Sequence, residues 1–171
     1  AILARGAGPK GVDYKDDASP VTDADRAAEH AITGLIEAAC SIPIIAEERF
    51  AAGVVPSVGR HFLLVDPLDG TKSYIAGKPD YTVNVALIED VIPVFGCVGV
   101  PATGEIYYGG TDRPATVERD GAMLPLRGRR PGPRLDVVAS RDHLSEATRQ
   151  YLAGLDLGER RSVGSSLKFC L

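Results

Sequence analysis

The sequence is poor in the residue types that build disulfide-stapled, zinc-bound or membrane-spanning proteins. It has three cysteines and three histidines among 171 residues, and no C-x-x-C pair. Cysteines this few and scattered exclude a disulfide framework and favour a reducing, cytoplasmic setting. The same scarcity argues against a zinc site. No apolar run approaches the roughly 20 residues of a membrane-spanning helix, so we expect no membrane partner.

Positive charge is also in short supply. The formal net charge is −4, which argues against a protein that coats nucleic acid. An anionic substrate would therefore need cations arranged at particular places rather than a basic surface. With 44% apolar residues, the chain can bury one good core, or one core and part of another.

One stretch, FLLVDPLDGTKSY (residues 62–74), contains most of the candidate chemistry. The apolar run Phe62–Val65 predicts a buried strand, and Pro67 and Gly70 predict a turn directly after it. A short helix is expected to follow the turn and to stop before Gly77.

Two carboxylates, Asp66 and Asp69, lie on this turn, and the helix is expected to span Thr71–Ala76. Carboxylates on a turn can hold a divalent cation, and free amides at a helix start can hold a phosphate. The D-P-x-D-G pattern also suits an ordinary surface turn. A second apolar run, Ile42–Ala46, ends directly in Glu47-Glu48, and two acid-tipped strands favour the metal site.

The first clear helix is expected after Thr22, a good N-cap residue, with acids in its first turn. Its predicted inward face consists of Ala28, Ala31, Ile32, Leu35 and Ala39. Ahead of it, residues 1–17 are expected to form the tail of a helix and a loop, and residues 50–61 a second loop.

The acid pair Glu47-Glu48 and the segment LVDPLDGTKSYIAGKPDYTVNVALI resemble the inositol monophosphatase superfamily of magnesium-dependent, lithium-sensitive phosphatases. The variant is most similar to the bacterial 3′(2′),5′-bisphosphate nucleotidase branch. The resemblance extends from about Ser19 to the last residue. It implies two or three bound Mg²⁺ ions, with the protein ligands Glu47, Asp66, the Leu68 carbonyl and Asp69.

The resemblance also assigns roles around the metals. Thr71, with Asp25 of the SPVTDADR segment behind it, would orient the attacking water as the catalytic pair. Lys15 is the candidate for a lysine that approaches the phosphates. The segments VASRDHLS and VGSSLK match the nucleotide side of the site. The implied substrate-binding residues are Gly70, Thr71, Lys72, His143, Ser165, Ser166 and Lys168.

Each nucleotide-side residue also has an ordinary interpretation, the serines as helix caps and Lys168 as a solvated charge. The leading hypothesis is a Mg²⁺-dependent hydrolase that removes the 3′-phosphate of adenosine 3′,5′-bisphosphate, or of its sulfated form. An inositol or fructose-bisphosphate phosphatase is the alternative enzyme, and a nucleotide-binding regulator of the same fold is the alternative without turnover. A homodimer is compatible with the resemblance.

The expected fold is α+β followed by α/β, in the layered αβαβα sandwich of sugar phosphatases. Successive strands at 81–88, 91–100 and 105–108, and a hairpin turning at Asp120-Gly121, indicate an antiparallel sheet in an N-terminal metal-binding domain, residues 1–133. Residues 134–171 read as the start of a C-terminal α/β substrate domain: strand 135–139, helix 144–152, strand 161–163 and a further helix opening at 164–166.

The family normally supplies one more metal-binding aspartate from a Trp-Asp-x-Ala-Ala-Gly-like helix start, and this sequence has no tryptophan. We therefore expect the 171 residues to be part of a longer polypeptide with an incomplete C-terminal domain. By itself, this stretch is expected to bind the first Mg²⁺ through Glu47 and Asp66 and the second only weakly through Asp69. Little turnover is expected from it.

Overall fold

A computed structural model of the chain describes residues 1–8, 11–15 and 19–171. The described part is built on a seven-stranded sheet with the strand order β3-β4-β5-β6-β7-β8-β9. Its strands are β3 (Ile44–Ala46), β4 (His61–Asp69), β5 (Thr82–Glu89), β6 (Ile92–Val100), β7 (Glu105–Gly110), β8 (Arg113–Arg119) and β9 (Ala122–Pro125). The predicted hairpin is confirmed: β8 pairs antiparallel with β9, and Asp120 and Gly121 both have positive φ angles in the turn.

Every pairing in this sheet is antiparallel except that of β3 with β4. The parallel register places Ala46 opposite Val65. Parallel strands end at the same edge of a sheet, so the residues that follow, Glu47 and Asp66, emerge side by side. β3 is shorter than the predicted strand at 42–46, because it begins only at Ile44.

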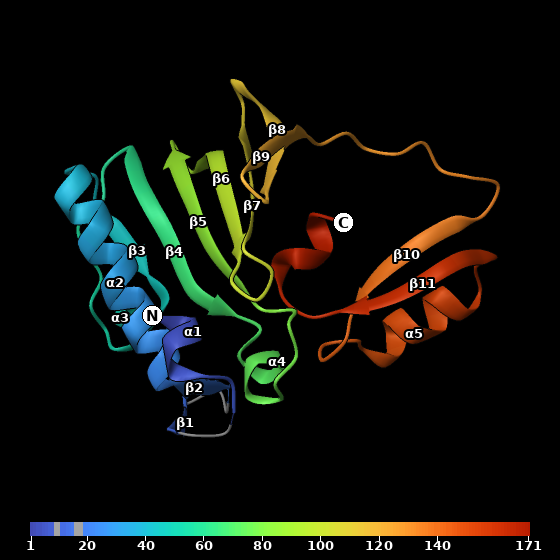
Figure 1. Ribbon diagram of the computed structural model, residues 1–171, viewed down its shortest axis with the longest axis horizontal. Helices are drawn as coiled ribbons and strands as arrows, with labels where there is room; N and C mark the ends of the chain where they lie inside the picture. Colours follow the sequence, from blue (N-terminus) through green and yellow to red (C-terminus); the bar gives the residue numbers. More distant parts are fainter. Residues whose placement is uncertain (9–10, 16–18) are drawn as a thin grey trace.

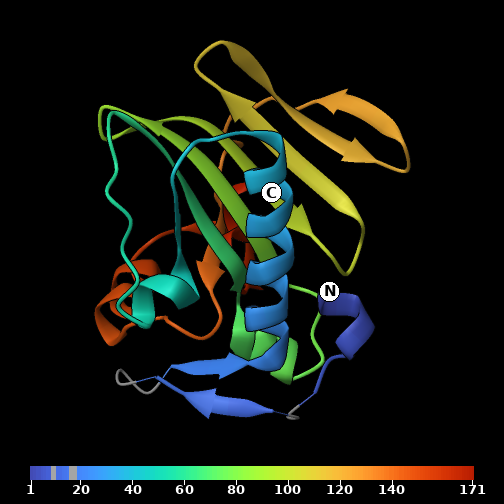
Figure 2. The same cartoon turned by 90° about the vertical axis from the view of Figure 1, so that its left-hand side faces the viewer.

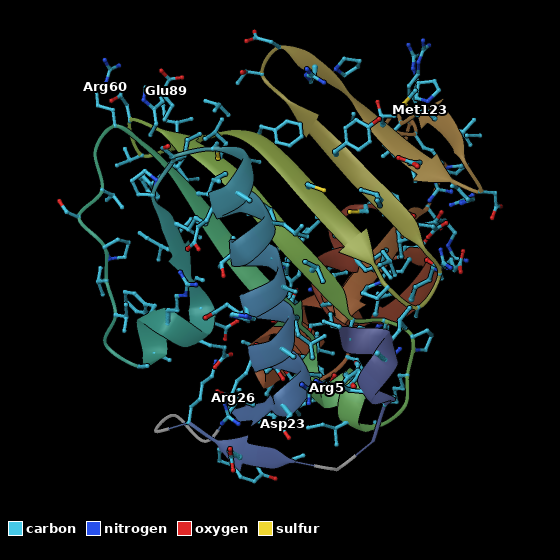
Figure 3. All side chains as sticks on the ribbon, turned by 60° about the vertical axis from the view of Figure 1, so that its left-hand side comes forward. Arg5, Asp23, Arg26, Arg60, Glu89 and Met123 are labelled. Carbon is cyan, nitrogen blue, oxygen red and sulfur yellow. The ribbon has the colours of Figure 1, made fainter. Side chains whose placement is uncertain are left out.

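One face of the sheet is covered by α2 (Asp23–Ala39), which lies across the strands (Figure 2). Thr22 caps this helix in a capping box: its Oγ1 accepts from the Ala24 amide at 3.1 Å, and the Asp25 carboxylate accepts from the Thr22 amide at 2.7 Å. Asp23 and Arg26 lie at this end of the helix, whereas Arg60 and Glu89 mark the opposite end of the sheet (Figure 3).

The predicted inward face of α2 is partly wrong. Ala28 is buried and Ile32 packs against the core, but Ala31 and Ala39 are exposed and Leu35 is 74% exposed. The helix instead buries two polar side chains, Glu29 and Thr33. Their hydrogen bonds turn the helix away from the orientation that its apolar spacing favours.

Those two side chains hold α3 (Glu47–Ala51), a short helix that the sequence did not predict. The Glu29 carboxylate accepts hydrogen bonds from the amides of Glu48 and Arg49, at 2.7 and 3.0 Å. Arg49 also donates to Thr33 Oγ1 at 2.8 Å. The expected loop at 50–61 therefore starts one residue past α3 and ends where β4 begins at His61.

The strand at the centre of the site is longer than predicted. β4 does not end at Val65 but continues to Asp69, with a register shift between Asp66 and Asp69 against β5. The turn expected inside this stretch is thus an irregularity within a strand. The predicted helix follows as α4 (Thr71–Ile75), and Gly70 before it has a φ of 89°, an angle that favours glycine.

Residues 135–171, named the C-terminal unit, contain a second sheet, in which β10 (Leu135–Ser140) pairs parallel with β11 (Leu157–Val163). α5 (Glu146–Ala153) connects these strands, and its N-cap Ser145 accepts from the Thr148 amide at 3.1 Å. β11 is longer than the predicted strand at 161–163. The last element is a 3₁₀-helix, η1 (Ser166–Phe169), at the place where a helix was expected.

The layers are therefore α2, the large sheet, and the C-terminal unit on the opposite side of that sheet, with η1 between them (Figure 1). Residues 126–134 form the long connection from β9 to β10. This arrangement confirms the expected mixture of layered helices and sheets. The three cysteines are free, and in the described part of the chain no helix has the length and apolar character needed to cross a membrane.

The start of the chain folds back beside α2. It contains α1 (Ile2–Arg5) and the small antiparallel pair β1 (Val12–Tyr14) and β2 (Pro20–Thr22). The expected loop over 1–17 therefore includes a strand, while its residues 9–10 and 16–17 lie outside the described part. Ile2 belongs to the same buried cluster as Ala28, Leu68 and Tyr74.

The buried carboxylate of Glu29 gives a prediction for stability. Glu29→Ala should lower the free energy of unfolding by about 1–3 kcal/mol, because it leaves two backbone amides of α3 without an acceptor. Urea denaturation measures the change. Glu37→Ala is the matched control, since Glu37 lies on the same helix and also pairs with Arg49, but at the surface. An equal effect of both substitutions would contradict the capping role.

Candidate active site

The acid pair Glu47 and Asp66 lies at the shared edge of β3 and β4. Asp66 is half-buried, and its pKa is raised to about 8 by burial, by the negative charges of Glu47 and Asp69, and by a hydrogen bond to Glu47. Neighbouring carboxyl groups that repel each other in this way occupy a position where a cation would be favourable. The site is therefore short of positive charge.

Hydrogen bonds from the surrounding backbone and strand orient Asp66. The Leu68 amide donates to one carboxylate oxygen at 3.2 Å, and Asn84 Nδ2 of β5 donates to the other at 3.4 Å. Asn84 was not predicted, because its place in an alternating strand gives no local signal of a site.

Lys15 supplies part of the missing positive charge. Its ammonium lies 2.6 Å from Glu47 Oε1 and 2.8 Å from Glu48 Oε1. Burial by itself would lower the pKa of Lys15, but its hydrogen bonds and charge interactions with Glu47 and Glu48 outweigh burial and raise it. The lysine expected to approach the phosphates thus lies against Glu47 and Glu48 in this structure.

Asp69 faces a different partner. Its Oδ2 accepts a hydrogen bond of 2.5 Å from the Ser166 amide, at the start of η1. Within residues 1–8, 11–15 and 19–171, no three His, Cys, Asp or Glu side chains converge closely enough to hold a metal ion. The donor chemistry nevertheless fits one cation between Glu47 and Asp66, which place two hard oxygen ligands next to each other. For a second cation, Asp69 retains its other carboxylate oxygen.

Thr71 and Asp25, the two residues predicted to be catalytic, are hydrogen-bonded to each other. Thr71 Oγ1 lies 3.1 Å from Asp25 Oδ1 and 3.0 Å from the Leu68 carbonyl oxygen, two acceptors for its single proton. Asp25 is 2% exposed, and its other oxygen accepts from the amide and the hydroxyl of Thr22 at 2.7 and 2.5 Å. Burial raises the pKa of Asp25, although the hydrogen bonds from Thr22 and Thr71 act in the opposite direction.

A pocket of about 260 Å³ brings the two parts of the chain together. Most of the predicted site residues line it, from the edge where β3 and β4 end, from the start of α4 and from the C-terminal unit: Glu47, Asp66, Leu68, Asp69, Gly70, Thr71, Lys72, His143, Ser165 and Lys168. Asp25 lies behind Thr71, outside the lining. The pocket also includes residues that the sequence did not single out, although each lies within or beside a quoted segment: Ser19, Pro20, Ser140, Asp142 and Gly164.

On the C-terminal wall of the pocket, the Lys168 ammonium contacts the Ser165 carbonyl oxygen and lies 4.9 Å from the centre of the Phe169 ring. The His143 side chain is exposed, and its amide donates to Ser140 Oγ at 3.2 Å. Ser166 does not line this pocket. Its hydroxyl bonds to Asn84 at 2.7 Å instead, so a contact of Ser166 with substrate stays a prediction.

Known proteins resemble this chain both in sequence and in fold. The sequence profile of the Inositol monophosphatase family matches residues 2–171. The 3′(2′),5′-bisphosphate nucleotidase CysQ of Salmonella typhimurium is 41% identical over 167 residues, which cover 96% of this chain and 67% of that protein. The histidinol-phosphatase of Mycobacterium tuberculosis is 36% identical over 111 residues, 65% of this chain and 42% of the relative.

Solved structures agree with these matches. CysQ from Bacteroides thetaiotaomicron, a bacterial member of the inositol monophosphatase family, has a TM-score of 0.73 at 32% identity; the match covers 99% of this chain and 69% of that one. The Thermotoga maritima IMPase has a TM-score of 0.79 at 21% identity, covering 96% and 63% of the two chains. The latter is a likeness of fold.

The acid pair gives a prediction for cation binding. Asp66→Asn keeps the shape of the side chain but removes one hard ligand. It should weaken Mn²⁺ binding by more than about 100-fold, because even changes in residues behind a ligand cost roughly 10- to 100-fold. Titration with Mn²⁺, followed by electron paramagnetic resonance, measures the affinity directly. Asp90→Asn serves as the control, since Asp90 lies at the opposite end of the sheet and pairs with Arg60. Unchanged affinity in Asp66→Asn would remove Asp66 from the ligand set.

Proposed function

The chain belongs to the inositol monophosphatase family, and we propose on that basis that it is a Mg²⁺-dependent phosphatase acting on adenosine 3′,5′-bisphosphate. The reaction would release the 3′-phosphate and leave AMP. In this proposal residues 1–133 hold two or three Mg²⁺ ions, and residues 134–171 select the substrate. The nucleotidases that match most of this chain support the choice of substrate.

The observation that carries the proposal is the meeting of three groups in one pocket: the carboxylates Glu47 and Asp66, the turn at Gly70, and the hydroxyl of Thr71. Bound Mg²⁺ would supply an acidified water and would neutralise charge on the phosphoryl oxygens. Glu47, Asp66, the Leu68 carbonyl and Asp69 are the residues that would hold the ions.

The protein groups around the attacking water are the Asp25–Thr71 pair. When the Thr71 proton is directed to Asp25 Oδ1, the lone pairs of Thr71 Oγ1 are free to accept a hydrogen bond from a water in the pocket. Asp25 is held by Thr22 and cannot rotate without breaking two hydrogen bonds. The pair therefore fixes the direction of the water without forming a covalent intermediate.

The opposite wall supports a substrate with two phosphates. Lys168 and His143 line the pocket across from the Gly70 turn, and a cation there has a use when the substrate has a second anionic group. A single phosphate bound at Gly70, Thr71 and Lys72 would leave these two residues without a contact to the substrate.

A substrate panel tests the proposal. Phosphate release is measured with Mg²⁺ on adenosine 3′,5′-bisphosphate, inositol 1-phosphate and fructose 1,6-bisphosphate. The initial rates are compared as ratios, so that the low turnover expected of these residues does not affect the comparison. The nucleotide should give the highest rate, Asp66→Asn should lose it, and Li⁺ should inhibit it. A higher rate on either sugar phosphate would reassign the substrate. Tight binding of the nucleotide without Mg²⁺-dependent release would indicate a regulatory protein.

Lys168→Ala tests the second phosphate separately. Loss of one charge-assisted contact should weaken the binding of adenosine 3′,5′-bisphosphate by about 1.5–3 kcal/mol, roughly ten- to a hundredfold. The binding of inositol 1-phosphate should change much less. The measurement is KM for each substrate, or Kd by calorimetry. Lys78→Ala is the control, since Lys78 is exposed and lies outside the pocket lining. Equal losses on the two substrates would mean that Lys168 has a structural role.

A further inference from the structure

A charged pair at the junction of the sheet and the C-terminal unit takes no part in the chemistry described so far. Asp80 lies in the loop between α4 and β5 and is 6% exposed. Arg141 follows directly after β10, and its Nη1 lies 2.5 Å from Asp80 Oδ2. Among the described residues, no other ion pair joins residues before 134 to residues after it. The two residues are therefore a specific link between the units.

Both partners have further contacts that converge on the ends of β10 and β11. Asp80 Oδ2 accepts a hydrogen bond of 2.5 Å from the Gly164 amide. Arg141 Nη2 donates to the Ser162 carbonyl oxygen at 3.0 Å, and the Arg141 backbone amide donates to the Val163 carbonyl oxygen at 3.3 Å. Arg141 thus connects the C-terminal ends of β10 and β11 to the loop between α4 and β5.

The junction is packed without spare room. A Cβ atom on Gly164 would lie 2.6 Å from Ser73 Oγ and 2.8 Å from Asp80 Oδ2. Burial by itself would raise the pKa of Asp80, but Arg141 and the Gly164 amide outweigh it and lower the pKa. The carboxylate is therefore ionised and paired in a confined place, where an unpaired charge would be costly.

The pocket lies immediately beyond this junction. The residues that follow Arg141 are Asp142 and His143, and the residue that follows Gly164 is Ser165; all three line the pocket. Arg141 and Asp80 do not line it. They lie behind both segments of the C-terminal wall, at the point from which each segment enters the pocket.

We propose that Asp80 and Arg141 are a positioning pair that sets the distance between the C-terminal wall of the pocket and the phosphate turn at Gly70. The pair fixes where His143 and Lys168 can meet a second anionic group of the substrate. It thereby determines the preference for a bisphosphate over a monophosphate. The selectivity part of this inference rests on the proposed function, whereas the positioning part does not.

The variants must avoid leaving one charge buried without a partner. The double variant Asp80→Asn with Arg141→Met removes both charges and keeps similar volumes. Arg141→Lys keeps the charge but lacks the second nitrogen that reaches Ser162. Arg134→Met is the matched control, because Arg134 also pairs with an aspartate, Asp156, but does so at the surface of the same unit.

Hydrogen exchange measured by mass spectrometry tests the positioning part without substrate. In the double variant, amide exchange should rise by about tenfold or more in residues 140–143 and 162–168, with β4 to β7 unchanged, because local opening is governed by local contacts. Arg141→Lys should lie in between, and Arg134→Met should match the original chain. Unchanged exchange at 140–143 and 162–168, or a uniform rise across the sheet, would overturn the positioning role.

Substrate measurements test the selectivity part. For adenosine 3′,5′-bisphosphate, the double variant should raise KM by about tenfold and leave kcat within about threefold, since it moves binding groups and not the reacting ones. KM for inositol 1-phosphate should stay within about twofold. Parallel losses on both substrates would refute the selectivity role. If the original chain does not prefer the nucleotide but local exchange still rises in the variant, the proposed function fails and the positioning role stands.

Discussion

The parallel pairing of β3 with β4 is the constraint on which the site depends. In a sheet that is otherwise antiparallel, this one pairing makes two strands end together, so that Glu47 and Asp66 emerge as neighbours. Adjacent carboxylates in a half-buried place repel each other. The ammonium group of Lys15, which lies against Glu47, relieves part of that repulsion in this structure. A bound cation would relieve it more fully, so affinity for cations is a direct result of strand direction.

Two further features keep this edge rigid. Glu29 holds the first amides of α3, which fixes the backbone that carries Glu47 and Glu48. The irregularity in β4 takes Pro67 and Leu68 out of the regular ladder, while Asp66 and Asp69 stay opposite Asn84 and Thr82 of β5. Buried hydrogen bonds thus position Glu47 and Glu48, and the irregularity in β4 positions Asp66 and Asp69. Neither arrangement requires a long loop.

Much of this could be predicted from local sequence. The strands, the hairpin at Asp120-Gly121 and the helix after Gly70 follow from residue types that act within a few positions. The buried face of α2 was predicted only in part, because the spacing of apolar residues does not reveal buried polar ones. Glu29 and Thr33 belong to that face. Contacts between distant segments left no local signal either. Nothing near Asp80 indicates that its partner is Arg141, and nothing in Asn84 indicates that it orients Asp66.

The close packing around Gly164 has a consequence for how such chains diversify. The C-terminal unit is linked to β9 by a long connection without regular structure, but its Leu167 and Cys170 pack against the buried cluster of Val100, Tyr107 and Val117 in the sheet. Any replacement of that unit would have to cover the same cluster. Every replacement would also have to present a residue without a side chain where the chain passes Ser73 and Asp80. Exchange of the C-terminal unit is therefore restricted twice, by the apolar cluster under η1 and by the close passage of the backbone at Gly164.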